Sequence, residues 1–186
     1  MKLHSYKNHL LIAMPSLRSE FFTKSVVYIY EHSEAEGTIG FIINQPLSAT
    51  LGNVLEHLKI KIDHGDIYDA PVYSGGPVGP DQGFVLHDSA HLPASSEEND
   101  KIIVTTTRDI LKQIADNKGP KNFIVTLGYS GWEPGQIEEE IAQNDWLVAP
   151  MNAAILFQTP ISQRWTTAAK TLGVDINKLS GQVGHA

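Results

Sequence analysis

Short runs of β-branched and aromatic residues recur along the chain, and most of them are apolar at nearly every position. The clearest runs, which we expect to be strands, are residues 9–14, 26–31, 38–43, 83–87, 101–105 and 123–127. Residues 146–149 and 153–157 are two further candidates. A strand with one face in water alternates apolar and polar residues, which these runs do not, so both faces of the predicted sheet should be covered.

Four segments carry helical signals between these runs. The first has residues spaced at i, i+3, i+4 and i+7, which form one apolar stripe: Leu51, Val54, Leu55 and Leu58. The second should begin near Thr106, with Asp109 in the position of a capping box, and end by Gly119. Its inward residues should be Ile110, Leu111 and Ile114.

The third and fourth helices should each begin beside a proline. Pro134 suits the first turn of the third helix, and the glutamates at 138, 139 and 140 lie where the helix dipole favours negative charge. The buried residues of this helix should be Ile137 and Ile141. The fourth helix should run over residues 159–173, and its inward residues should be Ile161, Trp165, Ala168, Ala169 and Leu172.

The order of these elements indicates the fold class. Strands and helices are interspersed without a regular βαβ alternation, which predicts an α+β fold with a mixed β-sheet and helices packed on it. No linker, charge block or internal repeat divides the 186 residues. We therefore expect a single domain over residues 1–186.

Composition excludes several classes of protein. The chain has no cysteine, which excludes a disulfide scaffold, a thiolate zinc site, an iron–sulfur cluster and a cysteine nucleophile. The longest apolar runs fall well short of the about 20 residues of a membrane span and of a signal peptide's core, so we expect a cytoplasmic protein. Because phosphate binding depends on clustered Lys and Arg, the net charge of −7 disfavours direct nucleic-acid binding.

Residues 127–136 (LGYSGWEPGQ) lie between a predicted strand and a predicted helix. This is the context of the hydrolase nucleophile elbow, G-x-S-x-G, which would make Ser130 a nucleophile. The position two after Ser130 is Trp132, however, where the elbow has glycine. A glycine-rich turn with Tyr129 and Trp132 packed over the edge of the core is the preferred interpretation, and a turn that binds a ligand is the other.

Residues 73–83 (YSGGPVGPDQG) form a second glycine cluster. The chain contains neither G-x-G-x-x-G nor the P-loop motif, and a strand rather than a helix follows Gly83. We therefore expect a turn built of glycine and proline, and no cofactor.

Histidines offer a weak metal hypothesis. His87 and His91 have an i, i+4 spacing that converges on one face only in a helix, and this stretch follows a strand. If their strands were neighbours, His32 and His87 could approach each other. A surface or hydrogen-bonded role is the expectation for both, and no metal site is predicted.

Two further patterns favour structural roles. Asp109, Glu138 and Glu140 could supply an acid and a base, but their predicted places in the first turns of helices already explain them. Residues 165–180 have spacing similar to a helix-turn-helix, yet residues 176–181 give a second helix of only about one and a half turns with one Lys. A short C-terminal helix is the preferred interpretation.

Taken together, these motifs resemble the bacterial YqgE/AlgH family. The resemblance rests on residues 8–15 (NHLLIAMP), Phe22, 25–28 (SVVY), 31–32 (EH), 40–46 (GFIINQP), 71–77 (PVYSGGP), 83–87 (GFVLH), 127–132 (LGYSGW), 135–138 (GQIE), 144–146 (NDW) and 184–186 (GHA). It implies a single-domain α+β protein of uncharacterised activity. It also implies a role in transcriptional regulation, the label that many members carry, and it supplies no agreed catalytic residues.

These observations predict a non-enzymatic protein that acts indirectly, through a protein partner or a small ligand. Direct DNA binding is the alternative, and a hydrolase using Ser130 or a His32/His87 site is a further one. Functional loops gather at strand ends, where glycines and polar groups are exposed. On that ground the predicted ligand- or partner-binding residues are Asn44, Gly75, Gly76, His87, Gly128, Tyr129, Gly131, Trp132 and Glu138.

Overall fold

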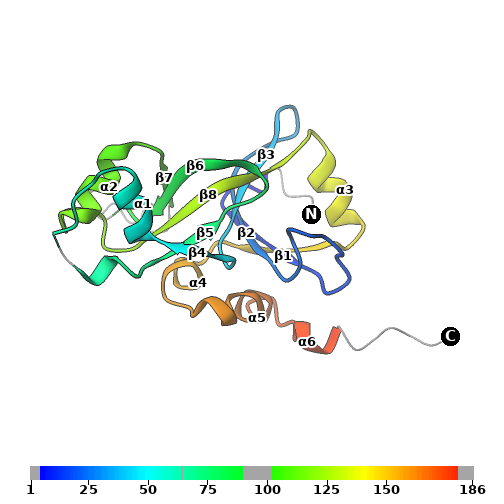
Figure 1. Ribbon diagram of the computed structural model, residues 1–186. Coiled ribbons are helices and arrows are strands. Elements are labelled where there is room, and N and C mark those ends of the chain that lie inside the picture. Colours follow the sequence, from blue (N-terminus) through cyan, green and yellow to red (C-terminus); the bar gives the residue numbers. More distant parts are fainter. Residues whose placement is uncertain (1–4, 64, 90–101, 180–186) are drawn as a thin grey trace.

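A mixed β-sheet forms the centre of the protein, as the computed structural model shows (Figure 1). The structure describes residues 5–63, 65–89 and 102–179. The strands in these ranges are β1 (His9–Ala13), β2 (Val26–Ser33), β3 (Gly37–Ile42), β4 (Pro46–Thr50), β5 (Pro71–Ser74), β6 (Val78–His87), β7 (Ile103–Thr105), β8 (Phe123–Trp132) and β9 (Trp146–Pro150). Their order is β4-β5-β8-β3-β2-β1-β9, with β6 also paired to β8 and β7 to β6. β5 and β8 are parallel and the other pairs are antiparallel.

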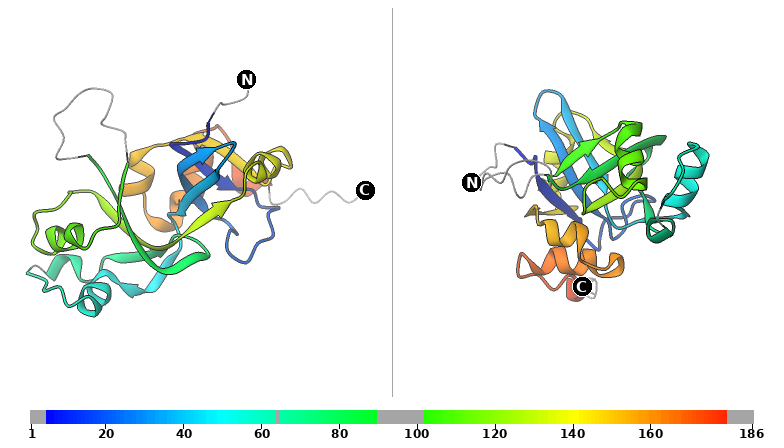
Figure 2. Two further views of the ribbon diagram at one scale, coloured as in Figure 1. Left: turned by 90° about the horizontal axis from the view of Figure 1, so that it is seen from above. Right: turned by 90° about the vertical axis from the view of Figure 1, so that its left-hand side faces the viewer.

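Helices cover the sheet in three groups. The α-helices are α1 (Leu51–His57), α2 (Arg108–Ala115), α3 (Gln136–Ala142), α4 (Ala153–Phe157), α5 (Arg164–Lys170) and α6 (Ile176–Leu179). The 3₁₀ turns are η1 (Gly65–Ile67) and η2 (Ile161–Gln163). α1 and α2 lie at one end, α3 at the other, and α4 to α6 form a layer along one side (Figures 1 and 2). This confirms the predicted α+β fold with a mixed sheet. No helix in the described part of the chain is long and apolar enough to cross a membrane.

Both faces of the central strands are buried, as the unbroken apolar runs predict. On β1, Leu10 and Ile12 pack into the cluster beneath α4 and α5, whereas Leu11 and Ala13 pack into the cluster beneath α3. Successive strand residues point to opposite faces, so an apolar residue is needed at every position. A third cluster lies under α1 and α2 against β5, β6 and β8.

β8 changes its pairing partners halfway along its length. Its first half pairs with β5 on one edge and β6 on the other, and its last residues pair with β3. Gly128 lies at the change with φ +74°, and Gly76 beside it has φ +152°. A Cβ on Gly75 would stand 2.2 Å from the carbonyl oxygen of Gly128. We call Gly75, Gly76 and Gly128 the glycine junction.

The structure corrects the glycine-rich turn that was predicted within residues 127–136. Residues 128–132 continue the strand instead of forming a turn, and β8 ends only at Trp132. Ser130 therefore lies inside a strand and is completely buried, with its hydroxyl donating to the carbonyl of Gly75 at 3.0 Å. The nucleophile-elbow hypothesis for Ser130 is wrong.

Three helix starts differ from expectation. Residues 153–157 form α4 and not a strand, because the Asn152 side chain accepts a hydrogen bond from the Ala154 N–H and caps a helix there. α2 begins at Arg108 with Thr107 as N-cap and no side-chain cap bond, so the predicted capping box is absent from this helix. Pro134 lies two residues before α3, outside its first turn.

The predicted fourth helix is two elements. It divides into η2 and α5, and Trp165, Ala168 and Ala169 are buried as expected. Leu172 is 38% exposed, beyond the end of α5. α6 spans four residues, which agrees with a short terminal helix and not with a recognition helix. Lys101, at the start of one predicted strand, lies outside the described residues.

Replacing Gly75 with alanine should lower the free energy of unfolding by about 3 kcal/mol, since the added methyl group meets backbone atoms that cannot rotate away. Urea denaturation measures the loss. Gly131→Ala in β8 is the matched control, because its Cβ would be 3.8 Å from the nearest atom, and it should change stability by less than about 0.5 kcal/mol. Equal losses in the two variants would contradict the close-approach argument.

Candidate functional site

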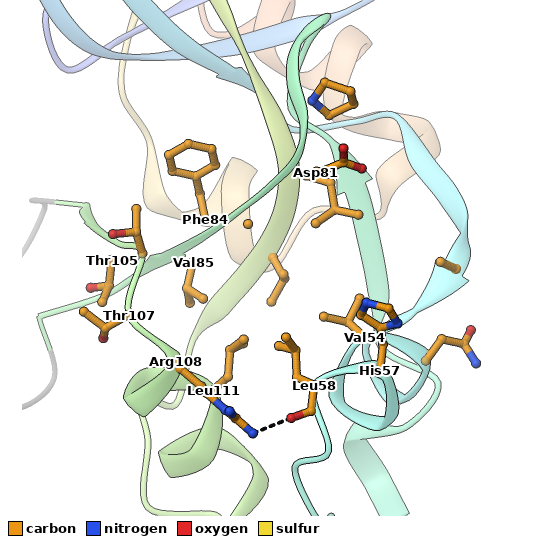
Figure 3. A pocket seen from close by; sticks show the side chains of 17 residues that line it. Val54, His57, Leu58, Asp81, Phe84, Val85, Thr105, Thr107, Arg108 and Leu111 are labelled. Atoms are coloured by element: carbon orange, nitrogen blue, oxygen red, sulfur yellow. Dashed lines mark hydrogen bonds between the residues drawn. The ribbon is translucent and has the colours of Figure 1, made fainter.

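A hollow lies between α1 and α2, over the sheet. We call it the α1–α2 groove; its volume is about 580 Å³. Its floor is made by residues of β6 and β8, and its walls by one helix on each side (Figure 3). Such a volume is typical of sites for small organic ligands.

Each helix buries some apolar residues of its stripe against the sheet and leaves others facing the groove. In α1, Leu51 and Leu55 are fully buried under the helix, which leaves Val54 and Leu58 half-buried at the groove wall. In α2, Ile110 and Ile114 are buried and Leu111 lines the opposite wall. The apolar floor beneath them is Val85, Val125 and Leu127.

Polar groups surround this apolar centre. His57 and Asp81 lie on one side, and Thr105 and Thr107 on the other (Figure 3). Thr107 is the N-cap residue of α2, but its side chain makes no cap bond. An apolar floor with a few polar groups at the rim can bury the body of a ligand and fix the orientation of its polar end.

Arg108 links the two walls. Its guanidinium donates a hydrogen bond to the carbonyl of Leu58, which ends α1 (Figure 3). The bond joins the first residue of α2 to the last turn of α1 across the end of the groove. The bond adds a polar contact between two helices that otherwise meet through their packing on the sheet.

The sequence-predicted site residues occupy several places and not one. The glycine junction is buried inside the sheet, where its residues pack against backbone. Tyr129 packs on Phe84, with ring centroids 5.9 Å apart, and Gly131 is exposed on β8. The remaining predicted residues lie at the two ends of the sheet and at a loop.

His87 contacts a residue that lines the groove. It is 9% exposed, and its Nε2 is 2.9 Å from the hydroxyl of Thr105, a groove residue. Its Nδ1 lies 2.8 Å from the carbonyl of Asp88. A carbonyl can only accept, so Nδ1 carries the proton and Nε2 accepts from Thr105. His87 therefore orients one polar group of the rim.

His32 is far from His87, because β3 and β8 lie between their strands. Its Nδ1 accepts from the backbone N–H of Tyr6 at 3.2 Å, so Nε2 carries the proton and donates to Glu138 at 2.7 Å. Both ring nitrogens therefore have hydrogen-bond partners. Through them, His32 connects the segment before β1 to α3. The His32/His87 site is wrong; His91 lies outside the described residues.

At the other end of the sheet, Phe22, Trp132 and Trp146 form an aromatic cluster beside the glutamates of α3. The indole N–H groups of Trp132 and Trp146 both donate to Oε2 of Glu140, at 3.0 and 2.8 Å. Phe22 stacks on Trp132 with ring centroids 5.6 Å apart. Glu140 lies beyond the first turn of α3, so its role is to accept these bonds and not to compensate the helix dipole.

Two other predicted residues hold loops and helix ends. Asn44 accepts from the N–H of Val26 at 2.8 Å and donates to the carbonyl of Lys24 at 2.9 Å. Asp109 lies in the first turn of α2, 3.4 Å from Lys112. Over the ranges that the structure describes, no three His, Asp or Glu side chains are grouped as metal ligands.

Sequence reasoning missed the groove because its walls come from distant segments. The available signal was the width of the apolar stripes: Val54, Leu58 and Leu111 extend beyond what a helix needs to pack on a sheet. Only the topology shows that these stripes face each other.

Comparison with known proteins gives consistent similarities. The model of the AlgH-like family matches residues 10–177. A UPF0301 protein of Coxiella burnetii (strain Dugway 5J108-111) is 50% identical over 186 residues, covering 100% of this chain and 99% of the relative. The solution structure of the AlgH protein from Pseudomonas aeruginosa has 40% identity and a TM-score of 0.77, covering 100% and 98% of the two chains. A Corynebacterium diphtheriae protein of 22% identity shares the fold with a TM-score of 0.71, covering 94% and 91%.

Replacing Glu140 with alanine should lower the free energy of unfolding by about 2–4 kcal/mol, because two buried indole N–H groups lose their acceptor. Glu140→Gln keeps an acceptor oxygen and should lose less. The neighbouring Glu139→Ala, on the exposed side of α3, should change stability by less than about 0.5 kcal/mol. Chemical denaturation followed by tryptophan fluorescence measures all three, and equal effects at 139 and 140 would contradict the bridging role.

Proposed function

The chain belongs to the AlgH-like family, as its motifs predict, and we propose that it is a non-enzymatic binding protein whose ligand occupies the α1–α2 groove. The ligand is a small molecule with an apolar body and a polar end. Any effect on transcription is indirect and passes from the occupied groove to a protein partner.

The observation that supports this proposal is an apolar floor left open between two helices. Val85, Val125 and Leu127 contribute to a hollow that the chain does not fill with its own side chains. Apolar surface that leaves water on binding provides most of the affinity of such sites. The polar rim then selects among ligands, since a polar end without a partner is costly to bury.

The groove is also placed where a ligand can alter the outer surface. Val54 and Leu58 lie on α1 and Leu111 on α2, so a molecule between them contacts both helices. The hydrogen bond from Arg108 to Leu58 is a polar link between these walls, and a ligand that changes their separation works against this bond and against the packing of both helices on the sheet. The outer faces of the two helices carry the change to a partner.

The charge of the chain supports the indirect route. A net charge of −7 repels a phosphate backbone at long range, whereas it is no obstacle to an uncharged ligand or a basic protein surface. A regulatory role, which the family label implies, agrees with this charge when the protein acts through a partner that itself contacts DNA.

The uncharged apolar fluorophore N-phenyl-1-naphthylamine should bind the folded protein, and a Val54→Trp variant should bind it at least about tenfold more weakly, because the indole fills the groove. Leu172→Trp is the matched control, since Leu172 is exposed and outside the groove, and it should bind like the unmodified protein. A fluorescence titration gives the affinities, and urea denaturation verifies that both variants fold. Equal affinity in all three proteins would overturn the proposal.

A further inference from the structure

A second cavity, separate from the α1–α2 groove, lies where three loops meet beside α5. Its volume is about 620 Å³, and it shares no lining residue with the groove. The loop before β2 contributes Thr23 and Lys24, the loop before β4 contributes Asn44 and Gln45, and the start of η2 and α5 closes it. We call it the Lys24 cavity.

Lys24 is held at the cavity in an uncommon backbone conformation. Its φ is +54°, in the left-handed region that residues other than glycine rarely adopt. The Asn44 amide fixes this conformation by donating to the Lys24 carbonyl at 2.9 Å and accepting from the Val26 N–H at 2.8 Å. The ammonium group lies 5.6 Å from the centre of the Trp165 ring, at the cavity wall. Strain of this kind persists where the surroundings impose it, often at binding sites.

A second cation lies directly behind the wall. Arg164 is 4% exposed and stands in the chain between the lining residues Ser162 and Trp165. Its Nε donates to the carbonyl of Thr159 at 3.1 Å and its Nη1 to that of Ile43, and its guanidinium lies 5.2 Å from the ring centre of Tyr73.

All these partners of Arg164 are uncharged. Within the described residues, neither Arg164 nor Lys24 forms an ion pair with a carboxylate. A buried guanidinium remains charged, and buried charges are ordinarily paired. Among the described residues, the positive charge of Arg164 therefore has carbonyl and aromatic partners but no carboxylate next to the Lys24 cavity.

The residues that line the cavity also favour an anion over a cation. None of the cavity residues is acidic: they are Thr23, Lys24, Asn44, Gln45, Pro46, Ile161, Ser162 and Trp165. The lining therefore carries the positive charge of Lys24 and no negative charge, although the net charge of the chain is −7. The amides of Asn44 and Gln45 each use one N–H on a backbone carbonyl, that of Lys24 at 2.9 Å and that of Phe21 at 2.6 Å, and each keeps a second N–H as a donor. The Trp165 face, Ile161 and Pro46 supply apolar surface.

From these observations we infer that the Lys24 cavity binds an organic anion, with a phosphate or carboxylate head and a flat apolar body. The head lies against the Lys24 ammonium and the neutral donors, in the positive field of Arg164. The body lies on the apolar lining beside Trp165. A volume of about 620 Å³ exceeds what a bare phosphate fills, so the apolar part contributes to affinity.

The test is an NMR titration of the ¹⁵N-labelled protein with phenyl phosphate, benzoate, inorganic phosphate and phenol at constant ionic strength. Phenyl phosphate or benzoate should shift the Trp165 indole N–H and the Asn44 side-chain amide, more strongly than inorganic phosphate or phenol at equal concentration. The response to phenyl phosphate against benzoate identifies which head the cavity prefers. Shifts confined to the α1–α2 groove, or none, would overturn the inference.

The matched variants leave Arg164 in place, because its buried bonds support the fold. Lys24→Ala should weaken binding of the preferred anion about tenfold and Lys24→Glu should abolish it, since a charge-assisted contact is lost and then reversed. Lys170→Ala, at the last residue of α5 and outside the cavity, should bind like the unmodified protein. Equal weakening in the Lys24 and Lys170 variants would show a general charge effect and overturn the site.

Discussion

Where β8 exchanges one partner for another, two stretches of backbone approach too closely for any side chain to stand between them. The glycine junction makes that approach possible, and both ends of the sheet depend on it. The half of β8 before Gly128 carries the floor of the α1–α2 groove, and the half after it carries Trp132 into the aromatic cluster under α3. Gly75 connects the first half of β8 to β3 through hydrogen bonds, because its N–H donates to the carbonyl of Leu127 and its carbonyl accepts from the N–H of Ile42.

The sequence predicted most of the sheet because buried strands have a strong local signature. The end of β8 was misplaced for a physical reason: glycine marks both tight turns and close backbone approach, and a single sequence does not separate the two. Residues 153–157 illustrate a second limit, since a run of five apolar residues suits a strand or a short helix equally, and the Asn152 cap decides between them.

The candidate site was harder to predict than the fold. Residues chosen for glycine and exposed polarity, such as Gly76 and Trp132, proved to be parts of the framework. The groove instead depends on α1 meeting α2, which are separated in the chain by β5, β6 and β7. Glu140 had a similar outcome: the sequence predicted a residue in the first turn of a helix, yet its carboxylate accepts from two buried indole N–H groups that only the tertiary structure brings together.

The late position of β8 in the chain has a consequence for synthesis. β3 ends at residue 42 and β5 at residue 74, but the strand that pairs with both begins only at residue 123. While a ribosome extends the chain between these points, the inner edges of β3 and β5 have no partner from this molecule. Unpaired apolar edges are templates for other chains. During this period the strands that will flank β8 at the centre of the finished sheet have unpaired edges. A chaperone that covers β-strands is therefore most useful before residue 132 has emerged.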